Sequence, residues 1–151
     1  MKYNSYYNPE DIKRMKFVAG LIPANSTVLD VGAYDNTFKE MLEKDGHEVT
    51  ATDIKPRSKD VFRVSITELR DNFKPFNCIV AMEILEHLTD KDLKKGVQQI
   101  LSMAKDTIII SVPSDEFPLN GEHVRSIDRE DLKQMFLRYS SSLWDLSLIH
   151  I

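Results

Sequence analysis

The sequence predicts a single α/β domain built on a doubly wound, mostly parallel sheet with helices on both faces. Three observations support this prediction. The chain has 151 residues, which is an ordinary size for one domain. Segments with helical spacing of apolar residues alternate with short apolar runs rich in β-branched residues. This alternation is typical of strand–helix–strand units, in which consecutive strands run parallel and the helices cover the sheet.

The first expected helix covers residues 9–22. Its apolar side chains recur on one helical face, while Asn8 and Pro9 are residue types that favour a helix start. Pro23 then ends the helix. We expect one face of this helix to pack against the sheet.

The next three elements form the first strand–helix–strand unit. Residues 27–31 are short, apolar and β-branched, which is typical of a strand that is buried on both faces. A helix is expected over residues 36–45, ended by Gly46, followed by a second strand over 48–53. His47, between them, is expected in a surface turn.

The middle of the chain predicts a second series of elements. Residues 61–65 form a weaker strand candidate, and residues 77–82 form a strongly apolar one. Thr89 and Asp90 can cap a following helix, whose apolar stripe continues to Ala104.

The last third contains the clearest strand, residues 107–112, which Pro113 ends. A polar loop over 114–121 follows, then a helix that Asp128 caps. Residues 143–151 alternate like a strand.

The composition excludes several classes of protein. The formal net charge of −4 disfavours nucleic-acid binding through a broad basic surface. No apolar run approaches the ~20 residues needed to span a bilayer, and the N-terminus has no apolar signal region. Cys78, the single cysteine, lies in an apolar run and is expected to be buried. We therefore expect a cytoplasmic protein without a membrane partner, with residues 1–151 as one domain and 1–8 as a flexible segment.

The candidate site follows the first two strands. In open parallel sheets, ligands bind at the carboxyl ends of the strands, near the point where strand order reverses. Asp53 ends the second predicted strand, where a carboxylate can accept hydrogen bonds from both hydroxyls of a ribose. Ile54 follows it and can cover one face of an adenine ring. A turn acid that merely ends the strand is the alternative.

Four segments, in this order, resemble the motifs of class I S-adenosylmethionine-dependent methyltransferases. They read VLDVGAYDNTF, TATDIKP, FNCIVAMEILEHL and IIISVPS. EILEHL is especially similar to the small-molecule branch that includes ubiquinone-biosynthesis enzymes, and GEHVRSIDREDLKQMF resembles the segment before that branch's last helix. The resemblance extends from Val28 to Phe136.

The resemblance implies a Rossmann-like fold that binds S-adenosylmethionine and transfers its methyl group to a small-molecule acceptor. Asp30, Gly32 and Ala33 match the positions that approach the methionine part of the cofactor. Three further matches are implied: Asp53 at the ribose; Ser65 and Ile66 at the adenine; Glu83 near the cofactor.

The turn after the first strand departs from the family pattern. The family has three alternating glycines here, of which this chain keeps Gly32, with Tyr34 and Asn36 at the other two positions. Asn36 can adopt a left-handed backbone or cap the next helix. Either the ring of Tyr34 turns outward and forms a wall of the cofactor pocket, or binding is weakened or lost. We expect binding to be retained, because the other motif positions are chemically intact.

The candidate catalytic residues are His87 and His123, as general bases for an acceptor hydroxyl. Hydrogen bonds that anchor their loops are the alternative for both. Arg125 is a candidate for contact with an acidic substrate group. The spacing of histidines and the single cysteine offer no metal site.

The chain ends early for this family, whose sheet closes with a hairpin of two strands after the last helix. The C-terminal hairpin is expected to be truncated, since residues 143–151 supply only one strand. An open apolar edge there predicts a homodimer. At the other end, Tyr3, Tyr6 and Tyr7 either fold over the pocket or form a disordered terminus.

Three functions other than small-molecule methyl transfer are compatible with parts of the sequence. The altered turn and missing strand favour a non-catalytic methyltransferase-fold domain that acts as a binding or regulatory subunit. A nicotinamide-binding protein is disfavoured because the G-x-G-x-x-G fingerprint is absent. A nucleic-acid methyltransferase is disfavoured by the acidic balance and by the lack of an Asn/Asp-Pro-Pro-Tyr-like segment after residues 77–82.

Overall fold

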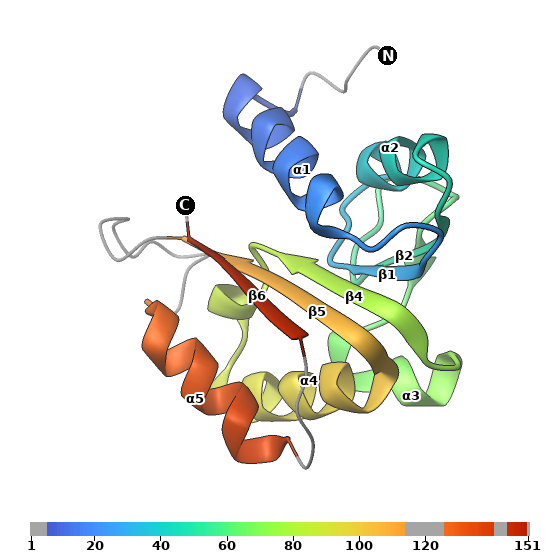
Figure 1. The fold of residues 1–151 in the computed structure, drawn as a ribbon. Helices are drawn as coiled ribbons and strands as arrows, with labels where there is room; N and C mark the ends of the chain where they lie inside the picture. The colour runs from blue at the N-terminus through green and yellow to red at the C-terminus, as the bar shows by residue number, and fades with distance from the viewer. Residues whose placement is uncertain (1–5, 114–125, 141–144, 151) are drawn as a thin grey trace.

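The computed structural model describes residues 6–113, 126–140 and 145–150, with side chains described as far as Ser140. Helices and strands alternate as the sequence predicts (Figure 1). The elements in chain order are α1 Pro9–Leu21, β1 Thr27–Val31, α2 Thr37–Lys44, β2 Glu48–Asp53, β3 Phe62–Arg63, η1 Ile66–Glu68, α3 Leu69–Asn72, β4 Phe76–Met82, η2 Leu85–His87, α4 Asp90–Met103, β5 Ala104–Val112, α5 Arg129–Tyr139 and β6 Asp145–His150.

The strands form one sheet in the order β3-β2-β1-β4-β5-β6. Every described pair of neighbouring strands is parallel. Strand order reverses at β1, which pairs with β2 on one side and with β4 on the other. The fold is therefore a Rossmann-like, doubly wound sheet, and its ligand crevice is expected at the carboxyl ends of β1 and β4.

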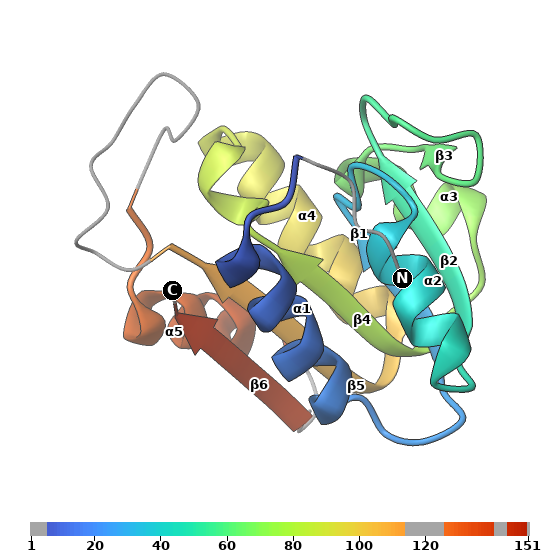
Figure 2. The ribbon, with the colours of Figure 1, turned by 90° about the horizontal axis from the view of Figure 1, so that it is seen from above.

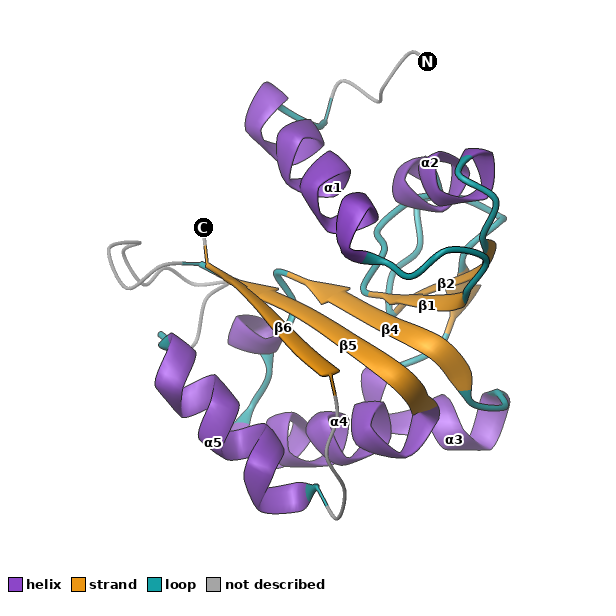
Figure 3. Cartoon of the chain, in the orientation of Figure 1, coloured by secondary structure: helices purple, strands orange, loops and turns teal. Residues whose placement is uncertain are grey.

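Two layers of helices cover the sheet (Figure 3). Helices α1 and α2 lie on one face, with α1 above β4 and β5 and α2 above β1 and β2 (Figure 2). Helices α3, α4 and α5 lie on the other face. Successive residues of β1 follow this division, because Val28 packs with α1 and α2 whereas Leu29 packs with α4. Burial on both faces explains why the strands read as continuous apolar runs.

The helix starts are fixed by side-chain caps. Asn8 and Asp11 form a reciprocal capping box at the start of α1. Thr89 caps α4 and Asp128 caps α5, as the sequence predicts. Asn36 does not cap α2: its side chain donates to Glu40 Oε1, and the carboxylate of Asp35 accepts the hydrogen bond from the backbone of the first helical residue.

Several predicted boundaries are wrong for identifiable reasons. The strand expected over 61–65 has only two paired residues, because the chain turns into η1 once the Ser65 hydroxyl caps that turn. Ala104 begins β5 instead of ending the stripe of α4. His47 is buried, and its Nδ1 accepts a hydrogen bond from the backbone of Ser26, so its surface assignment is wrong.

Cys78 is fully buried in β4, as expected. Among the described residues, no helix is both long enough and apolar enough to cross a membrane. Strand β6 is the outermost strand and pairs with β5 over residues 145–150. Tyr3, His123, Arg125 and the loop over 114–121 lie outside the described residues.

Candidate cofactor-binding site

A cavity of about 780 Å³ lies at the carboxyl ends of β1, β2 and β4. Its walls come from segments far apart in the chain: the residues before and within α1, the turns after β1 and β2, η1, and the segment from β4 to α4. This is the position at which strand order reverses. The cavity has the location and size of a small-ligand site in a parallel α/β fold.

The cavity brings together every described residue that the sequence assigned to cofactor or catalysis. These residues are Asp30, Gly32, Ala33, Tyr34, Asp53, Ile54, Ser65, Ile66, Glu83 and His87.

The turn after β1 requires glycine at its first position. Gly32 has φ +75°, and a Cβ atom there would lie 2.6 Å from Cδ1 of Ile84. The backbone N–H groups of Gly32 and Ala33 both donate to the carbonyl of Thr52. The turn is therefore fastened to β2 and packed closely against the segment that follows β4.

Tyr34 keeps the left-handed backbone of the glycine that it replaces. Its φ is +63°, a conformation that costs a non-glycine residue roughly 1–2 kcal/mol. Its ring stacks on Tyr6 with centroids 4.3 Å apart and an interplanar angle of 20°, and the Arg57 guanidinium lies 5.7 Å from the ring centroid. The ring thus forms part of the cavity wall together with Tyr6 and Tyr7.

Asp53 is held by the two turns that flank it. Its Oδ2 accepts a hydrogen bond of 2.8 Å from the backbone of Tyr34, and its Oδ1 accepts one of 2.7 Å from the backbone of Lys55. The substituted glycine position therefore orients the carboxylate that was predicted to bind a ribose. Each oxygen keeps a second lone pair for a ligand hydroxyl. Ile54, beside it, is 66% exposed and lines the cavity.

Asp30 is a buried carboxylate that is incompletely satisfied. It is 2% exposed, and its Oδ2 has no hydrogen-bond partner among the described residues. Burial raises the pKa of Asp30 to about 7, and the nearby carboxylates of Asp53 and Asp35 add to the rise. A cationic donor bound in the cavity would compensate this group.

Asp35 links the N-terminal segment to the turn. Its Oδ1 accepts hydrogen bonds from the hydroxyl of Tyr7 (3.0 Å) and from the backbone of Thr37 (2.9 Å). Burial, followed by the charge of Asp35 and this hydrogen bond, raises the pKa of Tyr7 above its ordinary value. Tyr7 is therefore a neutral donor at physiological pH.

Ser65 and Ile66 form the wall beyond β3. The Ser65 Oγ accepts a hydrogen bond from the backbone of Thr67 and lies 2.9 Å from the Thr67 hydroxyl. The side chain of Ile66 is buried against Gly96 of α4. Capping thus already engages the Ser65 oxygen, which makes it a weaker acceptor for a ligand amino group than a carboxylate.

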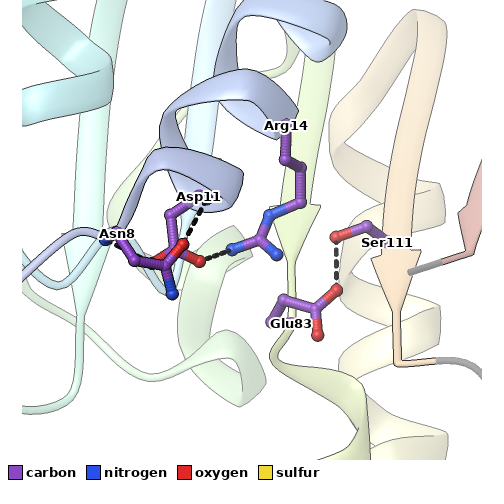
Figure 4. Close-up of polar contacts among 5 residues, drawn as sticks. All are labelled: Asn8, Asp11, Arg14, Glu83 and Ser111. Carbon is purple, nitrogen blue, oxygen red and sulfur yellow. Dashed lines mark hydrogen bonds and ion pairs between the residues drawn. The ribbon is translucent and has the colours of Figure 1, made fainter.

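Acidic side chains also follow β4. Glu83 has φ +55°, and its Oε1 accepts a hydrogen bond of 2.9 Å from the hydroxyl of buried Ser111 (Figure 4). Glu86 is 1% exposed, and burial raises its pKa to about 7. The Nε2 atom of His87 lies 3.6 Å from Glu86 Oε1, and His87 lines the cavity.

Within the described ranges, no group of three or more His, Cys, Asp or Glu residues is arranged to hold a metal ion.

The sequence reasoning missed Arg14, which reaches the cavity from α1. The sequence contains a pattern that could have indicated Arg14: Asn8, Asp11 and Arg14 follow one another at three-residue spacing in the first helix.

The comparisons with known proteins agree with this geometry. A family model described as a methyltransferase domain matches residues 3–140. The chain therefore belongs to the methyltransferase-domain family. A comparison with curated protein sequences found no match.

Solved structures with the same fold include a SAM-dependent methyltransferase from Archaeoglobus fulgidus, at 20% identity and a TM-score of 0.74, with 89% of this chain and 69% of that chain covered. Another is the Burkholderia thailandensis 1,6-didemethyltoxoflavin-N1-methyltransferase with bound 1,6-didemethyltoxoflavin and S-adenosylhomocysteine, at 19% identity and a TM-score of 0.69, covering 89% and 72%. The small RNA methyltransferase HEN1 matches at 16% identity and a TM-score of 0.66, over 92% of this chain and 22% of that one.

Proposed function

We propose that the protein binds S-adenosylmethionine in the cavity and transfers its methyl group to a small-molecule acceptor, in the manner of the ubiquinone-biosynthesis branch. The observation that carries the proposal is the placement of Asp30 and Asp53 beside each other in one cavity at the reversal of strand order. S-adenosylmethionine is cationic at neutral pH, and an unsatisfied buried carboxylate favours a cation.

Different residues of the cavity would contact different parts of the cofactor. Asp53 would hold the ribose hydroxyls, with Ile54 against the adenine and Ser65 and Ile66 around it. Asp30 and the backbone at Gly32 would face the amino-acid end. These assignments follow the strand order, because β3 and β2 lie on one side of β1 and β4 lies on the other.

The cofactor supplies an electrophilic methyl group on a sulfonium, so the protein's task is to position the acceptor and exclude water. Tyr6, Tyr7 and Tyr34 enclose one side of the cavity. His87 is the described candidate to take a proton from an acceptor hydroxyl, at its Nε2 atom beside Glu86. His123 stays a prediction for the same role.

A binding titration tests the proposal. Thermal melts with S-adenosylmethionine and S-adenosylhomocysteine are compared with melts in NAD and ATP. A ligand at ~100 times its Kd stabilises a protein by about 2.7 kcal/mol. We expect this stabilisation with the first two ligands only, and its loss in Asp53→Asn. Asp60→Asn, an exposed aspartate in the following loop, is the matched control.

A non-catalytic role is the second candidate. This role is favoured by Tyr34, which stands at a glycine position of the family and stacks on Tyr6 in the wall of the cavity. The two roles differ in an acceptor screen: bound S-adenosylmethionine that is never converted to S-adenosylhomocysteine by any small-molecule acceptor class supports the non-catalytic domain. No stabilisation by either cofactor form at millimolar concentration refutes cofactor binding in both roles.

A further inference from the structure

The N-terminal segment of residues 6–8 bridges two walls of the cavity. All three of its residues line the cavity, and α1 begins directly after them. Helix α1 lies above β4 and β5, whereas the two tyrosines of the segment contact the turn that follows β1 (Figure 2). The segment therefore lies across one side of the cavity.

Tyr6 fastens this segment to the turn through the ring of Tyr34. The two rings stack with their centroids 4.3 Å apart and an interplanar angle of 20°. Tyr34 is in turn held by Arg57, whose guanidinium lies 5.7 Å from the ring centroid and whose backbone N–H donates to the Tyr34 carbonyl at 2.8 Å. Glycine, which the family motif has at this position, offers no ring to either neighbour. The stack is therefore a property of this chain and not of the motif.

Tyr7 adds a second attachment one residue further along the turn. Its hydroxyl donates to Asp35 Oδ1 at 3.0 Å, and its ring meets the rings of Tyr6 and Tyr34 edge-on, with centroid separations of 5.5 and 6.4 Å. Burial and the Asp35 carboxylate raise the pKa of Tyr7, so the hydroxyl keeps its proton. Two consecutive residues of the segment are thus held by two consecutive residues of the turn.

These contacts are strong enough to close the segment and weak enough to let it open. An aromatic pair shifts an equilibrium by a factor of roughly two to ten. Tyr6 is 64% exposed, so water replaces much of what its ring loses on leaving Tyr34. Chain ends are also among the parts of a fold that open most readily. Because the rings contact one another, their stack opposes entry and release of a ligand to the same extent and leaves its Kd nearly unchanged.

We propose that the stack of Tyr6 on Tyr34 holds the N-terminal segment across the cavity and so sets the rates at which the cofactor enters and leaves. This inference rests on the proposed function, and it assigns a role to the tyrosine at the altered glycine position. The left-handed backbone of Tyr34 keeps its N–H on Asp53, while its side chain controls access. Binding and exchange are thus governed by different parts of one residue.

The rate constants for S-adenosylhomocysteine test the proposal. Surface plasmon resonance, with the protein immobilised away from its N-terminus, gives association and dissociation rate constants for the wild-type protein, Tyr6→Ala, Tyr34→Gly and the double variant. We expect each single variant to raise both rate constants about two- to tenfold and to change their ratio, the Kd, by less than about threefold. The double variant should match the faster single variant, because both substitutions remove the same contact.

Two further variants control the result. Tyr6→Phe keeps the ring, so we expect rate constants within about twofold of the wild-type values. Phe17→Ala removes an aromatic side chain of similar exposure, 59%, from the surface of α1 outside the cavity lining, and we expect wild-type rate constants. Melting temperatures without ligand show whether each variant is folded.

The other outcomes overturn the inference. Wild-type rate constants in both single variants mean that the tyrosines line the cavity without controlling access. Faster dissociation with an unchanged association rate means that the rings contact the ligand itself. Additive effects in the double variant mean that Tyr6 and Tyr34 act separately. A wild-type protein that binds no S-adenosylhomocysteine refutes the proposed cofactor together with this role, and that result is visible before any variant is made.

Discussion

Asp30→Asn tests whether the buried Asp30 carboxylate destabilises the folded protein in the absence of ligand and strengthens ligand binding. Asp30 is 2% exposed, and one of its oxygens has no hydrogen-bond partner among the described residues. Burial, together with Asp53 and Asp35, raises its pKa from 3.8 to about 7. Ionisation of Asp30 therefore opposes folding when no cationic ligand is bound in the cavity. Asparagine has nearly the same shape and cannot ionise.

The sign and size of the effect follow from this pKa. Because the pKa is higher in the folded state, the folded protein binds the extra proton between pH 4 and pH 7. The contribution of Asp30 to the free energy of unfolding is therefore greatest below pH 4 and is lost as the pH rises to about 7. The rise from 3.8 to about 7 corresponds to roughly 4 kcal/mol of lost stability. An amide in the same place leaves polar atoms unsatisfied at a cost of ~1–3 kcal/mol, so we expect Asp30→Asn to gain about 1–3 kcal/mol at pH 8.

Urea denaturation at pH 5, 6, 7 and 8 measures the effect on both proteins without ligand. Glu86, whose pKa is also raised to about 7, contributes a slope of the same sign to each. The difference between the two proteins therefore reports Asp30. Titration with S-adenosylmethionine at pH 8 completes the test, and the variant is expected to bind at least about tenfold more weakly, since a charged partner is lost.

A variant that is less stable than the wild-type protein at pH 8, with an unchanged pH slope, would falsify this reasoning. It would mean that Asp30 is satisfied in the folded protein and is not strained by its charge. Asp60→Asn, at an exposed position, is expected to change neither stability nor binding.

Three other predictions concern the turn and the sheet edge. Gly32→Ala should lower the free energy of unfolding by about 1–3 kcal/mol, because the new Cβ atom would contact Ile84 and the φ of residue 32 is positive. Gly20→Ala, at an open position on α1, should raise the free energy of unfolding by up to about 1 kcal/mol. Equal effects of the two substitutions in urea denaturation would count against the packing argument. Tyr34→Gly should change S-adenosylhomocysteine affinity by less than about threefold, because the ring stacks on Tyr6 and the backbone donor to the Asp53 carboxylate is retained. A tenfold gain in calorimetry would show that the ring obstructs the site. The homodimer predicted through residues 143–151 should elute at about twice the 17.4 kDa chain mass, and elution at the monomer mass at high concentration would refute it.

Most of the fold could be predicted because the longer strands and helices carry their own local pattern, whereas α3 and the short turns η1 and η2 do not. β1 and β2 have the bounds that the sequence indicated, since apolar β-branched runs between turn residues leave little alternative. The α4–β5 boundary could not be placed, because Ala104 and its neighbours suit a helix end and a strand start equally well. Tertiary pairing of Ala104 with Phe76 decides it.

The site residues could be predicted in kind but not in conformation. The strand-end argument and the resemblance to methyltransferase motifs together selected ten residues that line one cavity. They could not decide the position of the Tyr34 ring, because that depends on Tyr6, which is 28 residues earlier. Nor did they select Arg14, which lines the same cavity from α1.

Local sequence patterns were enough to predict the alternation of the main strands and helices, the parallel sheet and the strand ends at which polar residues lie. These properties depend on local periodicity and on short-range turn chemistry, which neighbouring residues fix. Three features depend on the folded chain: one oxygen of Asp30 has no hydrogen-bond partner among the described residues, the Tyr34 ring stacks on Tyr6, and Arg14 lines a cavity with several acidic side chains. Burial and electrostatic environment are sums over residues distant in the chain, and they exist only once the sheet has brought those residues together.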